Sequence, residues 1–146
     1  MNDKVKSLLF DLLQVTSLLL LLFTGPVLTN NMVITSLQIL SIMIVVSAVW
    51  EMRETKFYRV PDVGKQNSLV TGGIYRYIRH PMYSAQILLA LSLVLNSFTF
   101  LRLFIFVILV TNFLFKIRYE ENLLTKNFPQ FSGYRRKTVR LIPFLY

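Results

Sequence analysis

The sequence predicts an all-α, polytopic membrane protein with about four transmembrane helices in two hairpins. Its 146 residues are 54% hydrophobic with a mean hydropathy of +0.55, which is more apolar surface than a soluble domain of this size can bury. No charged residue occurs from Leu12 to Trp50 or from Leu103 to Phe115. Because a helix needs about 20 mostly apolar residues to cross the hydrocarbon core, such stretches are typical of membrane spans.

Four spans account for the apolar stretches. In chain order they are expected at about Ser7–Leu28, Met32–Trp50, Pro81–Leu95 and Phe98–Phe115, the last continuing as a helix through Leu124. Turn-forming residues separate the members of each pair: Gly25, Pro26, Asn30 and Asn31 in the first, Asn96 and Ser97 in the second. Two short turns predict two antiparallel helical hairpins.

The basic residues predict the orientation in the membrane. Of the 16 lysines and arginines, all but Arg102 lie before the first span, between the second and third, or after the fourth. The positive-inside rule then predicts cytoplasmic termini and a cytoplasmic middle loop, in a bacterial inner membrane or the endoplasmic reticulum. Arg102 is expected to snorkel to the opposite interface. The formal charge of +9 is thereby explained without a nucleic-acid partner.

The chain is expected to form one domain over residues 1–146, in which residues 1–50 are an N-terminal hairpin and residues 51–146 carry the polar segments. It has no cysteine and one histidine, which argues against a zinc site. It also lacks a glycine-rich phosphate loop and a dinucleotide fingerprint.

The segment Gly73–Tyr83 is the most informative stretch. It holds two arginines, three tyrosines and the only histidine directly before an apolar span. Proline suits the first helical turn, so we expect the third helix to begin at Pro81 with His80 near its cap. Free N–H groups there, with Arg79 and His80, would favour a carboxylate or phosphate. On physical grounds alone, anchoring at the lipid headgroups explains these residues equally well.

A second cluster follows the fourth span, in the segment Lys116–Glu121. Asn112, Lys116 and Glu120 are spaced by four and share one helical face, which we expect to point into the bundle. Paired glutamates beside cations could hold the hydroxyls or amine of a ligand. Taken by itself, a solvated helix end with surface ion pairs is the more economical interpretation. The basic and aromatic tail that follows could lie on an anionic membrane or close over a pocket.

These residues resemble a known family. The elements that carry the resemblance are Leu69-Val70-Thr71-Gly72-Gly73-Ile74-Tyr75, Arg79-His80-Pro81-Met82-Tyr83, Glu120-Glu121, Tyr134, and Arg140-Leu141-Ile142-Pro143. Together they resemble the isoprenylcysteine carboxyl methyltransferases and the related membrane phospholipid N-methyltransferases. The resemblance covers about Leu69 to Pro143, and the first two spans carry no family signature beyond being apolar. Pro129, Phe131 and Ala85 depart from the family pattern.

The resemblance implies an S-adenosylmethionine-dependent methyltransferase with a cofactor pocket on the cytoplasmic face. The cofactor contacts that it implies are Asn67, Ser68, Leu69, Val70, Tyr75, Arg79, His80, Pro81, Met82, Tyr83, Glu120 and Glu121. Lys116 stands where the family has a basic residue, typically arginine, near the methyl acceptor, and Arg118 follows two residues later. Either would orient a lipophilic acceptor that enters from the bilayer between the third and fourth spans. No metal is implied.

The acceptor itself stays open. A prenylated cysteine carboxylate, a phospholipid amine, and a small lipophilic thiol or amine all fit, and the oligomeric state is not predicted. Two other functions are weighed against methyl transfer. One is an NADPH-dependent reductase of the membrane sterol type, which has a similar histidine-proline-tyrosine region and tail. The other is a non-catalytic membrane protein.

Overall fold

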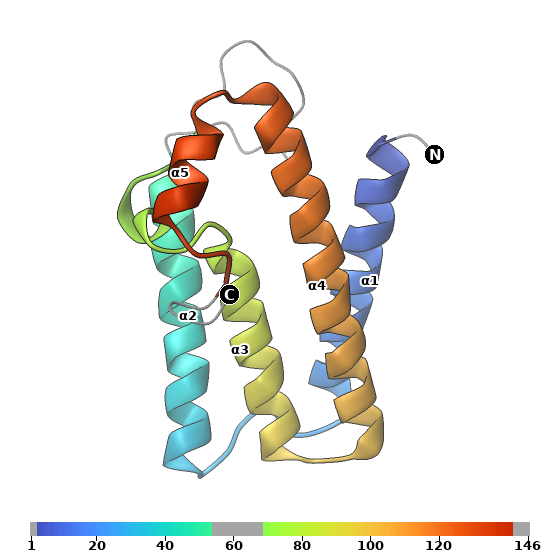
Figure 1. Cartoon of the computed structure of the whole chain (residues 1–146). Helices are drawn as coiled ribbons and strands as arrows, with labels where there is room; N and C mark the ends of the chain where they lie inside the picture. Colours follow the sequence, from blue (N-terminus) through green and yellow to red (C-terminus); the bar gives the residue numbers. More distant parts are fainter. Residues whose placement is uncertain (1–2, 54–68, 142–146) are drawn as a thin grey trace.

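The computed structural model describes residues 3–53 and 69–141, which are helical apart from loops and one isolated bridge between Ile78 and Val139. In chain order the elements are α1 (Asp3–Phe23), α2 (Met32–Met52), the short 3-10 helix η1 (Gly73–Arg76), α3 (Pro81–Asn96), α4 (Phe100–Asn127) and α5 (Phe131–Lys137), shown in Figure 1. This confirms the predicted all-α fold. Asn67 and Ser68 lie outside the described residues, as do residues 142–146.

Local sequence signals explain where three helices begin. The Asn31 side chain caps α2 by accepting from the N–H groups of Val33 and Ile34. The Thr99 hydroxyl caps α4 by accepting from the Arg102 N–H at 3.2 Å. Proline occupies the first position of α3, as the His80-Pro81 junction predicts.

The first helix differs from its predicted bounds. α1 runs from Asp3 to Phe23 and so starts before Ser7 and stops short of Leu28. Gly25 and Pro26 follow directly, and both disfavour continuation of a helix. Residues 24–31 therefore form a longer connection than the predicted turn.

The four long helices alternate in direction, so that the start of α1, the end of α2, the start of α3 and the end of α4 meet at one end of the bundle (Figure 1). We call this the polar end. Across the bundle the order is α2, α3, α4, α1, because α2 packs chiefly on α3 and α1 chiefly on α4. The connection between α1 and α2 passes the far end of α3, where Asn96 Nδ2 donates to the Pro26 carbonyl at 2.8 Å. The first pair of helices is thus antiparallel but not a packed hairpin.

The core packs three of the four long helices against one another. Its buried apolar residues come from α1, α3 and α4: Leu21, Ala90, Leu93, Val94, Ile105, Leu109 and Phe113. Most other large apolar side chains of α1 and α2 are exposed, as expected for helices that face lipid.

Three helices are long and apolar enough to cross a membrane: α1 from Val5, α2 and α4. α3 is apolar but has only 16 residues, so it is about 24 Å long and shorter than the hydrocarbon core of about 30 Å. α4 has 28 residues and, at about 42 Å, exceeds that thickness, which agrees with the predicted extension past Phe115. The start of α3 consequently lies beside Lys116–Glu121, before the end of α4.

Arg102 corrects one prediction. It does not snorkel outward but is 0% exposed, and its Nη2 donates to the Leu93 carbonyl at 2.6 Å. The guanidinium occupies space beside Gly25, where a Cβ atom would overlap it. Among the described residues, its Nε and Nη1 have no hydrogen-bond partner. Snorkelling requires a helix face that points to lipid, whereas Arg102 lies on the face of α4 that turns toward α3 and the α1–α2 connection.

We therefore expect Arg102 to contribute packing volume more than charge. Arg102→Met should leave the unfolding free energy within about 1 kcal/mol of wild type, because it fills similar volume and removes two unpaired donors. Arg102→Ala should lower it by roughly 2–5 kcal/mol through a cavity. Thermal unfolding in detergent measures both. Equal destabilisation by the two variants would mean that the bond to Leu93 is the main contribution.

Candidate functional site

The segment before α3 is fixed to the tail of the chain at the polar end. Ile78 and Val139 form a parallel bridge, in which the Arg79 N–H donates to the Val139 carbonyl at 2.8 Å and the Val139 N–H to the Tyr77 carbonyl at 3.0 Å. The His80 N–H donates to the Arg140 carbonyl at 3.1 Å. The described part of the tail therefore lies against the approach to α3.

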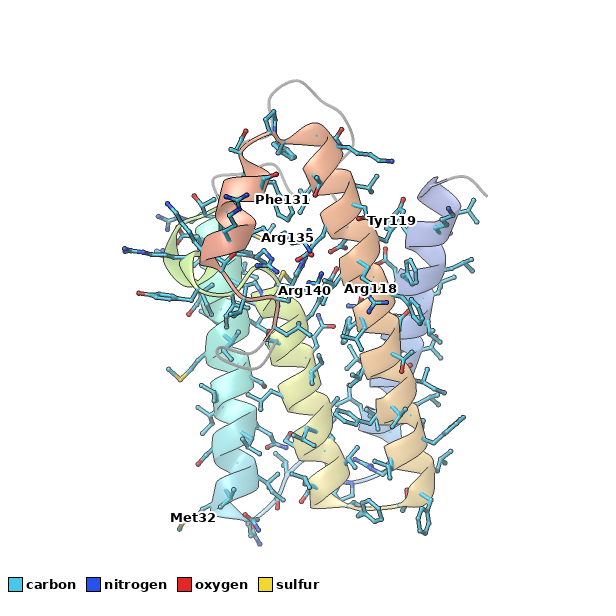
Figure 2. The ribbon with its side chains drawn as sticks, viewed as in Figure 1. Met32, Arg118, Tyr119, Phe131, Arg135 and Arg140 are labelled. Atoms are coloured by element: carbon cyan, nitrogen blue, oxygen red, sulfur yellow. The ribbon has the colours of Figure 1, made fainter. Side chains whose placement is uncertain are left out.

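Buried ion pairs strengthen this attachment. Glu121 is 3% exposed, and its carboxylate accepts from Arg79 Nε at 2.8 Å and from Arg140 Nε at 3.1 Å. Arg79 Nη1 also donates to the Arg135 and Thr138 carbonyls. Figure 2 shows Arg135 on α5 and Arg140 on the tail that follows α5, beside the start of α3. Glu121 and Arg79 are thus occupied by the tail.

A cluster of three side chains lies at the start of α3. The Tyr83 hydroxyl donates to Glu120 Oε1 at 2.6 Å, and His80 Nδ1 is 3.6 Å from Glu120 Oε2. The His80 and Tyr83 rings stack with centroids 5.6 Å apart, and Tyr83 stacks on Phe113 at 4.9 Å. His80 Nε2 is 3.6 Å from Glu121 Oε1, longer than a hydrogen bond, and has no hydrogen-bond partner among the described residues.

Next to this cluster is a buried network on Lys116. Its Nζ donates to Asp11 Oδ1 at 2.6 Å and to Gln14 Oε1 at 2.8 Å, both on α1. Gln14 in turn donates to Gln86 Oε1 on α3 at 2.8 Å. Lys116 Nζ also lies 5.1 Å from the centroid of the Tyr83 ring. The face predicted for Asn112, Lys116 and Glu120 does point into the bundle, and Asn112 Nδ2 donates to the Phe10 carbonyl at 3.1 Å.

The structure brings only some of the expected site residues together. His80, Tyr83 and Glu120 form the cluster, and Lys116 lies next to it. Arg79 and Glu121 adjoin it through the tail, Pro81 is buried, and Met82 is half-buried in the first turn of α3. Leu69 and Val70 are half-buried in the loop before η1. Arg118, labelled on α4 in Figure 2, is exposed and lies outside the cluster. Asn67 and Ser68 are outside the described residues.

Tyr75 lies between the cluster and the end of α2. It is buried in η1, its hydroxyl donates to Met52 Sδ at 2.8 Å, and its carbonyl accepts from the Tyr134 hydroxyl at 2.6 Å. η1 itself begins at Gly73, whose φ of 51° suits glycine. Glu51 at the end of α2 fills the space that side chains at Gly72 and Gly73 would occupy. Burial, with a smaller contribution from Tyr134, raises the pKa of Tyr75 to about 12.

This raised pKa predicts a loss of stability in alkali. The Tyr75 phenol keeps its proton in the folded protein up to a pKa of about 12 but loses it near its ordinary pKa of 10.0 when unfolded. The free energy of unfolding should therefore decrease as the pH rises through this interval. Chemical unfolding at several pH values in detergent measures the slope. Tyr75→Phe should reduce the slope but not abolish it, because burial also raises the pKa of Tyr134 to about 12. An unchanged slope would show that the Tyr75 phenol titrates normally.

The sequence did not predict the contacts made by Asp11, Gln14 and Thr138, or the ion pair of Arg140 with Glu121. Asp11 had one available signal, since it is a carboxylate inside the predicted first span, where unpaired charges are costly. Among the described residues, no group of three or more histidine, cysteine, aspartate or glutamate side chains could hold a metal ion.

Comparison with models of known protein families identifies the family to which this chain belongs. A family model described as phospholipid methyltransferase matches residues 29–130, more than two thirds of the chain. The chain belongs to the phospholipid methyltransferase family. The matched region contains α2, η1, α3 and α4, and with them the cluster of His80, Tyr83 and Glu120 and the neighbouring Lys116. No curated protein matches the chain significantly.

Membership of this family of membrane methyltransferases confirms the resemblance and the integral membrane location. The match differs in extent from the region that carries the resemblance. The match begins at residue 29 and so includes the second span, for which no signature was expected, and it ends at residue 130, before the tail motif at Arg140–Pro143. α1 lies outside it.

Proposed function

We propose that this phospholipid methyltransferase family member is an S-adenosylmethionine-dependent enzyme that methylates a lipophilic acceptor at the polar end of its bundle. The observation that carries the proposal is the cluster of His80, Tyr83 and Glu120 at the start of α3, inside the matched region. In the proposed topology both termini and the loop between α2 and α3 are cytoplasmic, and residues 1–146 act as one domain.

The side chains present fit the cofactor. Its amino-acid carboxylate needs donors, and His80 Nε2 is a buried nitrogen with no hydrogen-bond partner among the described residues. The N–H groups of His80, Tyr83 and Ser84 at the start of α3 already donate to backbone carbonyls, so the helix itself contributes chiefly the positive end of its dipole, which favours an anion. Its ribose hydroxyls and amine need acceptors, and Glu120 is a carboxylate with one oxygen bonded to Tyr83. The Glu120 side chain is 20% exposed, so it remains accessible.

The proposed roles follow from these contacts. His80 would hold the amino-acid end, Glu120 would accept from the hydroxyls or amine, and Tyr83 would orient the Glu120 carboxylate. Bound S-adenosylmethionine supplies a methyl group already activated by its sulfonium. The residues therefore have to position the two reactants and exclude water, with little need for acid–base groups.

The other expected residues take supporting roles. Arg79 and Glu121 would hold the tail against the site instead of contacting the cofactor, because both are occupied by ion pairs and carbonyls. Leu69, Val70 and Tyr75 would form the wall toward η1. Of the two cations proposed for the acceptor, we retain Lys116, since Arg118 is exposed. The acceptor would enter from the bilayer between α3 and α4.

Methyl transfer is tested on purified protein with isotopically labelled S-adenosylmethionine and extracted membrane lipids. Mass spectrometry should find the label in a lipid or lipophilic small molecule, and its position should separate carboxylate, amine and thiol acceptors. Loss of the label with His80→Ala is the matched control. If no label is transferred while NADPH raises the melting temperature, the reductase would replace the methyltransferase. If neither cofactor binds, the non-catalytic alternative holds.

A further inference from the structure

The helix outside the matched region supplies partners to the site. α1 precedes residue 29, yet its Asp11 and Gln14 contact Lys116 at 2.6 and 2.8 Å. The two residues are three apart on one helix and so share a face. Gln14 is itself held through its amide nitrogen by Gln86 on α3, which turns its oxygen toward Lys116. Three helices therefore fix the position of one ammonium group.

The main consequence of this network is that Asp11 balances the charge of Lys116. The Lys116 and Asp11 side chains are 8% and 25% exposed, and they form an ion pair next to the Tyr83 ring. A buried lysine alone would give the acceptor side of the site a positive charge at low dielectric, where it attracts anions strongly. Paired with Asp11, the same lysine contributes almost no net charge.

We propose that Asp11 is a specificity-determining residue that balances the charge of Lys116 and so keeps the site from favouring free carboxylates over acceptors whose reacting group is neutral or an amine. The inference rests on the proposed function for the location of the acceptor beside Lys116. Asp11 is a positioning residue here, since it neutralises and orients the lysine and does not contact the reacting atoms. The methyltransferase site would then include α1.

Binding of two matched probes tests this without catalysis. Palmitate and hexadecylamine carry the same chain length with opposite headgroup charge, and their dissociation constants can be measured in an uncharged detergent. The quantity of interest is the ratio of the palmitate constant to the hexadecylamine constant. Because the pair is balanced, we expect wild type to show no strong preference between the two probes. Asp11→Asn leaves Lys116 unbalanced and should lower the ratio roughly tenfold, because removing one partner exposes the charge of the other.

The remaining variants separate a charge effect from a structural one. Lys116→Met should raise the ratio by roughly tenfold, and the double variant Asp11→Asn/Lys116→Met should return it to within about threefold of wild type. A merely structural salt bridge would weaken both probes together in every variant. Lys126→Met removes an exposed lysine from the same helix and should change nothing. If Asp11→Asn does not fold, comparing Lys116→Met with the double variant still measures the effect of Asp11.

The proposal is overturned if Asp11→Asn leaves the ratio of the two dissociation constants unchanged. It is also overturned if Asp11→Asn lowers the ratio but Lys116→Met does not raise it, or if neither probe binds the wild type. S-adenosylmethionine binding is measured on the same samples. Its loss with an intact charge-dependent ratio would count against the proposed cofactor and not against the role of Asp11.

Discussion

Glu120→Gln is expected to weaken S-adenosylmethionine binding by roughly a hundredfold, or about 2.7 kcal/mol. The change keeps the size of the side chain but removes the charge that strengthens its hydrogen bonds. Glu120 is also the only glutamate of the pair with an accessible carboxylate, since Glu121 is occupied by Arg79 and Arg140. Calorimetric titration in detergent measures the affinity.

Glu120→Gln should leave the fold intact. Glutamine can still accept the bond from Tyr83 that joins α3 to α4, and the lost charge affects only the longer contact with His80 at 3.6 Å. We therefore expect the melting temperature to change little while the affinity falls. Unchanged affinity in a folded variant would remove Glu120 from the cofactor site.

Glu121→Gln is expected to have the opposite effect, lowering the stability more than the affinity for S-adenosylmethionine. It removes the charge that two buried arginine contacts share, at 2.8 and 3.1 Å. Truncating one partner of a buried, hydrogen-bonded charge pair costs roughly 2–5 kcal/mol, because the remaining charges stay buried. The loss should appear first as opening of the tail, since Arg79 and Arg140 join the tail to the segment before α3.

Amide hydrogen exchange locates this opening. The N–H groups of Arg79, His80 and Val139 bond across the two segments and should exchange faster in Glu121→Gln than in wild type. Glu120→Gln, the same change one residue earlier, is the control and should leave them protected. If both variants expose these amides equally, the two glutamates would not have separate roles.

Signals within one helix predicted the structure well. Proline at position 81 indicated where α3 begins, and spacing by four indicated that Asn112, Lys116 and Glu120 share a face. These signals are local, because they depend on backbone geometry and on helical periodicity.

Contacts between distant segments could not be predicted in the same way. The short connection between the first two helices suggested a packed hairpin, yet its residues pass the end of α3 and place α1 against α4. The partners of Lys116 follow from that packing, so Asp11 was not expected. The same uncertainty about which face of α4 turns inward made the prediction for Arg102 wrong.

Titration of the purified, detergent-solubilised protein with S-adenosylmethionine and, separately, with NADPH tests the proposed methyl-donor site most directly. We predict saturable binding of S-adenosylmethionine at one site per chain, lost on His80→Ala and Glu120→Gln, and no saturable binding of NADPH. Saturable NADPH binding, or S-adenosylmethionine binding that both variants retain in full, would contradict a methyl-donor site at the start of α3.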